Sequence, residues 1–112
     1  MTSKNKAKGS AWERAIVAAL QSEGFTDAER MYGAGRQDDR GDIRGLSGWT
    51  IEAKDHARHD IAGWLEELRV EMANGKTPYG AVVIKRRQAS TDKAYCVIPW
   101  SVLMELLRIT NA

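Results

Sequence analysis

Several features that mark large classes of proteins are scarce or absent in this 112-residue sequence. A single cysteine, Cys96, excludes an internal disulfide and suits a reducing compartment. No apolar run approaches the roughly 18 residues that span a bilayer, and the polar, lysine-bearing start lacks the apolar segment of a secretory signal. We therefore expect a cytoplasmic protein that does not bind membranes. We also expect a single domain, because domains commonly hold about 100–150 residues.

Signatures of metal and nucleotide binding are also sparse. The chain has two histidines, His56 and His59, with no cysteine near them, whereas zinc sites use three or four such ligands. We expect these histidines to be solvated or to contact phosphate. The glycines of residues 33–41 form neither a GxGxxG pattern nor a Gly-Lys-Ser/Thr ending, so no nucleotide cofactor is expected. Cys96 is expected to be buried in a strand and inert.

The net charge of +2 is too small to indicate a polyanionic partner, but the basic residues are grouped. We expect residues 1–8 to form a flexible basic arm ahead of a single domain over residues 9–112. Glycines beside Arg36 and Arg40 suit a loop that adapts to a phosphate backbone, although a plain solvent loop fits this segment equally well. Solvated surface is the ordinary alternative for every basic group. The groups are Lys4, Lys6 and Lys8; Arg36, Arg40 and Arg44; and Lys85, Arg86 and Arg87.

The spacing of apolar residues predicts three helices and five strands. The first two helices are expected to end at Gly24 and Gly75, and Ser101 is placed to cap the third. A helix between the third and fourth strands forces a crossover, which predicts an α/β fold with a mixed central sheet of about five strands flanked by helices. The order is helix–strand–strand–strand–helix–strand–strand–helix. The strands are expected in residues 25–34, on both sides of a turn in residues 42–54, and in residues 79–85 and 94–98.

The second helix carries one apolar stripe that is expected to face the core. Its charged residues are expected to lie largely on the opposite face. The stripe consists of Ile61, Trp64, Leu65, Leu68 and Met72, and the opposite face carries Glu66, Glu67, Arg69 and Glu71.

The hairpin over residues 41–54 holds the most informative charges. Strand side chains alternate between faces, so Glu52 and Lys54 point the same way while Ala53 points into packing. Asp42 reaches the same edge if the turn at Leu46–Gly48 sets the pairing, whereas a slip of one residue would turn it away.

Two neighbouring carboxylates repel each other unless a cation joins them. A hard divalent ion, Mg²⁺ or Mn²⁺, suits the oxygens of Asp42 and Glu52 and would activate a bound water. Lys54 would orient or deprotonate that water, or neutralise charge on a reacting phosphate. The ordinary alternative is a surface ion pair between Lys54 and one carboxylate.

Glu13 is the fourth polar residue of interest. It shares helical spacing with Ile16, Val17 and Leu20 and so lies along the apolar stripe of the first helix, where a carboxylate is unusual. Alternatively, Ser10-x-x-Glu13 forms a capping box, in which Glu13 binds a free backbone N–H at the start of the helix. The two roles are compatible.

The order of helix-borne Glu13, then Gly41-Asp42, then Ile51-Glu52-Ala53-Lys54 resembles the PD-(D/E)XK nuclease superfamily. Small archaeal-type and phage-type Holliday-junction resolvases are the most similar members, because residues 8–14, Lys-Gly-Ser-Ala-Trp-Glu-Arg, resemble their opening. The resemblance covers roughly residues 8–100. Gly41 departs from the pattern, since the family name places proline there.

The resemblance implies a restriction-endonuclease-like core and a set of site residues. Asp42, Glu52 and the backbone carbonyl of Ala53 would ligate Mg²⁺, with Mn²⁺ as a substitute. Glu13 would complete the shell of metal and water, which favours its site role over capping, and Lys54 would serve the attacking water. Such enzymes cleave DNA by water attack and leave 5′-phosphate ends.

We therefore expect a Mg²⁺-dependent, structure-specific endonuclease that resolves four-way DNA junctions. Symmetric cutting of two strands needs two sites, which predicts a C2 homodimer. Alternatives are a nuclease of the same fold acting on duplex, flap or single-stranded DNA, and a non-catalytic DNA-binding module. Residues expected to contact DNA are Lys6, Lys8, Ser10, Arg36, Arg40, Lys85 and Arg86.

Overall fold

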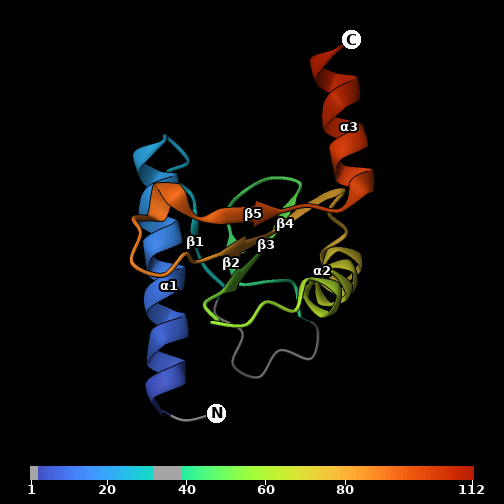
Figure 1. The fold of residues 1–112 in the computed structure, drawn as a ribbon. Coiled ribbons are helices and arrows are strands. Elements are labelled where there is room, and N and C mark those ends of the chain that lie inside the picture. Colours follow the sequence, from blue (N-terminus) through green and yellow to red (C-terminus); the bar gives the residue numbers. More distant parts are fainter. Residues whose placement is uncertain (1–2, 32–38) are drawn as a thin grey trace.

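A computed structural model describes residues 3–31 and 39–112 of the chain (Figure 1). It has the predicted α/β architecture, in which helices flank a five-stranded mixed sheet. The elements are α1 (Ser3–Ser22), β1 (Glu29–Arg30), β2 (Ile43–Arg44), β3 (Trp49–Lys54), α2 (Ile61–Gly75), β4 (Tyr79–Ile84), a 3₁₀ helix η1 (Thr91–Lys93), β5 (Tyr95–Val97) and α3 (Trp100–Thr110).

The strands lie in the order β1-β2-β3-β4-β5, so each pairs with its neighbour in the chain. The central pair, β3 and β4, is parallel, and the other pairs are antiparallel. Parallel pairing needs a crossover, and α2 supplies it. The mixed sheet and the order of elements are thus confirmed as predicted.

The two faces of the sheet pack on different helices. Trp12 and Ile16 of α1 pack with Ile43 and Ile51 on one face, while α2 packs on the other face through a second apolar cluster. Figure 1 shows the sheet between α1 and α2. The Trp12 indole also donates a hydrogen bond to the backbone oxygen of Val83, at 3.1 Å, and so ties α1 to β4. The second cluster comprises Trp64, Leu68, Val82 and Ile84.

Helix α1 begins earlier than predicted. It is helical from Ser3, within the segment expected to be an arm, and it continues through Gly9 and Ser10. Lysine and alanine are good helix formers, and one glycine in a long helix costs only about 1 kcal/mol. Ser10 and Glu13 therefore lie in the interior of the helix, and the capping-box interpretation of this pair is wrong.

Three local predictions also differ from the structure. Cys96 is exposed and lies in β5, a three-residue strand at the edge of the sheet. Ser101 does not cap α3, which begins one residue earlier at Trp100 with Pro99 in the cap position. Within the described residues the first strand is reduced to Glu29–Arg30. The predicted strand residues 32–34, and Arg36, lie outside the described residues.

The described helices include none that is long and apolar enough to cross a membrane. Helix α3 extends away from the body of the molecule at the end opposite the N-terminus (Figure 1). It is attached through Val102, which is buried, while Trp100, Leu107 and Ile109 are exposed.

Candidate active site

The strand register places Asp42 beside β3, as predicted from the hairpin pattern in the sequence. Ile43 pairs with Ile51, and the backbone N–H of Asp42 donates to the oxygen of Ile51 at 2.8 Å. The Asp42 carboxylate in turn accepts a hydrogen bond, 2.8 Å long, from the backbone N–H of Ala53. Asp42 is therefore held at the end of β3 by both its backbone and its side chain.

The backbone at Gly41 has a conformation that proline could not adopt. Its φ is +97°, and an added Cβ would lie 2.9 Å from the oxygen of Ile51. A proline ring fixes φ near −65° and could not adopt this conformation. The positive φ at Gly41 thus lets the chain pass close to β3 and deliver Asp42 to it.

Glu52 and Lys54 lie on the same face of β3, toward α2, while Ala53 packs into the core beside α1. Glu52 is buried, with 5% of its surface exposed. The Lys54 ammonium donates to Glu67 Oε2 of α2 at 2.9 Å and lies 5.8 Å from the centre of the Trp64 ring. The predicted alternation is confirmed, and α2 supplies the ion pair of Lys54.

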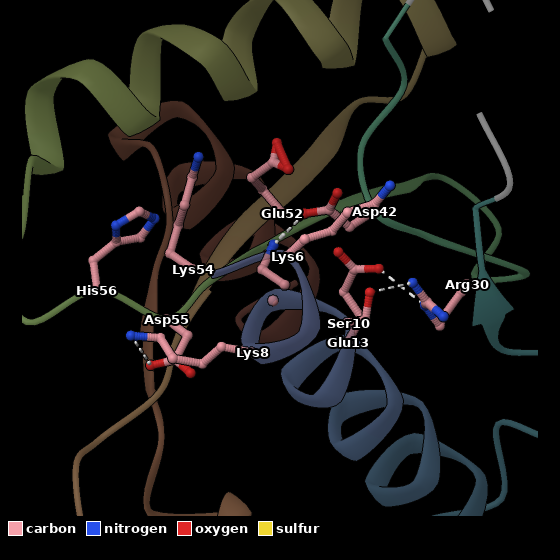
Figure 2. A pocket seen from close by; sticks show the side chains of 12 residues that line it. Lys6, Lys8, Ser10, Glu13, Arg30, Asp42, Glu52, Lys54, Asp55 and His56 are labelled. Atoms are coloured by element: carbon pink, nitrogen blue, oxygen red, sulfur yellow. Dashed lines mark hydrogen bonds and ion pairs between the residues drawn. The ribbon is translucent and has the colours of Figure 1, made fainter. Parts of the chain in front are cut away.

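A cavity of about 490 Å³ opens at this end of β3, between α1 and the sheet (Figure 2). It brings together all four expected catalytic residues and three of the expected DNA contacts. Its lining consists of Lys6, Lys8, Gly9, Ser10, Glu13, Arg30, Asp42, Glu52, Ala53, Lys54, Asp55 and His56.

Arg30 of β1 holds two side chains of α1 in place. Its Nε donates to Glu13 Oε1 at 3.0 Å, and its Nη2 donates to Ser10 Oγ at 3.1 Å. Burial and the charge of Asp42 raise the pKa of Glu13, against the opposing effect of Arg30. Sequence reasoning missed this role of Arg30, because the contact joins residues 17 positions apart and depends on how β1 packs against α1.

Glu71 was also missed, and its predicted location is wrong. It was expected on the polar face of the second helix, yet only 2% of it is exposed. The signal was present, since Glu71 follows Leu68 by three positions and Trp64 by seven and so lies on their stripe. Carboxylate oxygens of Asp39, Glu52 and Glu71 all lie within 4.8 Å of one another.

These carboxyl groups strongly affect one another's ionisation. Burial, together with the carboxyl groups of Asp42 and Glu71, raises the pKa of Glu52 far above its usual range. Burial and the neighbouring Asp39 and Asp42 raise the pKa of Glu71 to about 7. For Lys54, burial acts to lower the pKa, but the hydrogen bond to Glu67 and the charges of Glu52 and Glu67 outweigh it and raise the pKa.

The expected DNA-contacting residues do not all lie at this cavity. The Lys8 ammonium is 3.9 Å from the Asp55 carboxylate, whose side chain is 4% exposed. Lys85 and Arg86 instead line a separate cavity of about 320 Å³ with both histidines. Arg40 lies beside Gly75 at the end of α2.

The arrangement suits hydrolytic chemistry on a phosphate ester. Carboxylate oxygens, a lysine held in its charged form and lysines at the rim converge on one cavity. No protein-family model, curated protein or solved structure matches the chain. A function can therefore be proposed only from the geometry of these residues and from the resemblance of the short motifs.

Proposed function

We propose that this protein is a Mg²⁺-dependent, structure-specific endodeoxyribonuclease that cleaves four-way DNA junctions. The observation that carries the proposal is the convergence of Asp42, Glu52 and Lys54 at one end of β3, in a cavity that Lys6 and Lys8 also line. A surface ion pair would not need two carboxylates, one of them buried. The motif resemblance supplies the junction as substrate.

The donor set matches a hard divalent cation. Asp42 and Glu52 offer oxygen ligands only, and their mutual repulsion at a site where Glu52 is buried favours an added positive charge. The Ala53 carbonyl and Glu13 complete the set of residues that would hold Mg²⁺ or Mn²⁺. When bound, such an ion lowers the pKa of a coordinated water and polarises a phosphoryl oxygen.

The protein's own residues then have distinct roles. Lys54 donates to the Glu67 carboxylate, and a lysine paired in this way acts as a cation that stabilises charge on the phosphate. Arg30 holds Glu13 and Ser10 in place on α1. Lys6 and Lys8 contact the DNA backbone, which selects for shape and not for base sequence.

Digestion of a labelled four-way junction with Mg²⁺ tests the proposal. We expect cleavage by the wild type, none in excess chelator, and a loss of about 100-fold or more in Lys54→Ala and Asp42→Asn. Lys93→Ala and Asp92→Asn, at exposed positions of η1, serve as matched controls and should cut normally. An intact junction with wild-type protein, or equal cutting by all four variants, would refute the assignment.

The same experiment separates the alternative substrates. Junction, flap, duplex and single-stranded DNA are compared at equal salt, since phosphate contacts make binding depend on salt. If another of these substrates is cleaved faster than the junction, the protein is still a metal-dependent nuclease, but its substrate is not the four-way junction. DNA binding unaffected by chelator, with no cleavage of any substrate, would indicate a non-catalytic binding module.

We further propose that the protein acts as a homodimer in the cytoplasm. Two opposed strands of a junction must be cut, and each chain contributes one cavity of this kind, so a two-fold pair of chains supplies the two sites. A reducing compartment suits the exposed thiol of Cys96.

A further inference from the structure

We infer that Asp39, Glu52 and Glu71 form a second divalent-cation site, distinct from the Asp42–Glu52 pair of the proposed active centre. The site joins three parts of the fold: the segment before β2, strand β3 and helix α2. It shares Glu52 with the active centre but does not depend on nuclease activity. Its ligand is a hard cation such as Mn²⁺ or Mg²⁺, because all three donors are carboxylates.

Glu71 provides the strongest observation for this site. It is 2% exposed, and neither of its carboxylate oxygens has a hydrogen-bond partner among the described residues. A buried carboxylate without a partner is costly, and native proteins pair nearly all such groups. The charge of Glu71 therefore calls for a positive neighbour, and no side chain of the described residues donates a hydrogen bond to it.

The geometry around Glu71 suits coordination. Oxygens of Asp39, Glu52 and Glu71 lie within 4.8 Å of one another, which is close enough for a single ion to contact all three. Glu52 is also buried, so two of the three donors are withdrawn from water. Asp39 is exposed and provides the open side through which an ion can enter.

The position of Asp39 is fixed by two hydrogen bonds. Its Oδ1 accepts from the backbone N–H of Gly41 at 2.9 Å, and its backbone oxygen accepts from Asn74 Nδ2 of α2 at 2.7 Å. A cation between Asp39 and Glu71 would add a third link between this segment and α2. Asp42 follows Asp39 by three residues, so the second ion would also help to hold the segment that leads to Asp42 in place.

Protons are the competing explanation for the same cluster. A carboxylate only accepts hydrogen bonds, so Glu71 can bond to Asp39 or Glu52 if one member of the pair is protonated. A shared proton would satisfy the cluster without metal. Measuring bound Mn²⁺ distinguishes the two explanations, because a cluster that is satisfied by a shared proton would not bind the ion.

Binding of Mn²⁺ to the full chain at pH 7.5 tests the inference by equilibrium dialysis and electron paramagnetic resonance. We expect two ions per chain in the wild type and one in Glu71→Gln and Asp39→Asn. Asp39→Asn retains Oδ1 as an acceptor for Gly41, so this exposed variant should fold even if Glu71→Gln does not. Glu66→Gln, an exposed position on the same helix, is the matched control and should bind two ions.

The outcomes separate this site from the active centre. Wild-type stoichiometry in both Glu71→Gln and Asp39→Asn would overturn the second site, and so would the absence of Mn²⁺ from the wild type. Loss of one ion in Asp42→Asn, with two ions retained in Glu71→Gln and Asp39→Asn, would support the proposed catalytic metal and overturn this inference. Loss of one ion in Glu71→Gln and Asp39→Asn, with none lost in Asp42→Asn, would support this inference and count against the proposed catalytic metal.

Discussion

Lys54 and Glu71 show how charge is compensated at single residues. Lys54 bonds to Glu67, and the charges of Glu52 and Asp42 also favour its protonated form, so its burial is compensated. In Glu71, by contrast, burial and the neighbouring negative charges both raise the pKa. One helix, α2, therefore supplies both a stabilising partner for Lys54 and an uncompensated carboxyl group beside Glu52.

This imbalance predicts how stability depends on pH without metal. The pKa of Glu71 is raised to about 7 in the folded chain, against about 4.3 when unfolded. Between these values the folded state holds a proton that the unfolded state has released, so stability falls as pH rises, by up to about 1.4 kcal/mol per pH unit. Urea unfolding in chelator at pH 5, 6 and 7 measures this loss.

Glu71→Gln is expected to reduce that slope, because glutamine does not titrate, while Glu52 still contributes a fall of the same sign. Glu66→Gln should keep the wild-type slope, since Glu66 is fully exposed on the same helix. Identical slopes in wild type and Glu71→Gln would contradict the raised pKa. Adding Mn²⁺ should stabilise the wild type more at pH 7 than at pH 5, because metal competes with protons for the carboxylates.

At the scale of the element, the hairpin of β2 and β3 shows how one backbone conformation positions the Asp42 carboxylate. Its first strand, β2, has only two residues, and Asp42 reaches Ala53 because the backbone turns at Gly41 with a positive φ. Side chains at such a φ are strained, and here an added Cβ would also lie 2.9 Å from the oxygen of Ile51. The position of one carboxylate thus depends on a single glycine.

Gly41→Ala is expected to destabilise the protein by about 1–2 kcal/mol and to reduce junction cleavage further, through displacement of Asp42. Gly9→Ala is the matched control, because Gly9 lies inside α1 with no atom within 4 Å of an added Cβ. Alanine there should stabilise the helix by up to about 1 kcal/mol. Thermal unfolding of both variants compares their stability, and the initial cleavage rate of Gly41→Ala is compared with that of the wild type. Equal stability of the two variants would contradict the expected strain at Gly41.

Local patterns accounted for the elements and for part of the site. The apolar run of β4 and the stripe of α2 were readable because burial there follows simple periods. Glu13 could be predicted as a candidate site residue because a carboxylate on an apolar stripe is unusual, and it lines the cavity. Glu71 occupies the same kind of position and was assigned to the polar face by its residue type.

Other features depend on contacts between distant segments. Arg30 reaches Glu13 across 17 positions, and Asn74 holds the backbone of Asp39 across 35. No periodic pattern encodes such pairs, since they follow from how β1 and α2 pack in three dimensions. The start of α1 was misplaced for another reason: Gly9 and Ser10 are typical of a helix entry, yet they lie within the helix.

At the scale of the whole molecule, α3 is the least integrated helix. It has 11 residues, and helices of this length are marginal in water without tertiary packing. Val102 is buried, but Trp100 is 73% exposed and Ile109 is 60% exposed. Figure 1 shows the helix extending from the body of the molecule, so most of its length is free to contact a second chain.

The proposed dimer and this exposed helix lead to a joint prediction. At micromolar concentration the wild type is expected to sediment as a dimer, and Ile109→Asp to shift toward monomer because a charge replaces an exposed apolar side chain. Thr110→Asp adds the same charge at the neighbouring exposed position and should remain dimeric. A monomer of Ile109→Asp would still hold one complete cavity, so it should nick a junction without paired cuts. A wild type that sediments as a monomer yet makes paired cuts would refute the two-chain requirement, because one chain would then be cutting both strands.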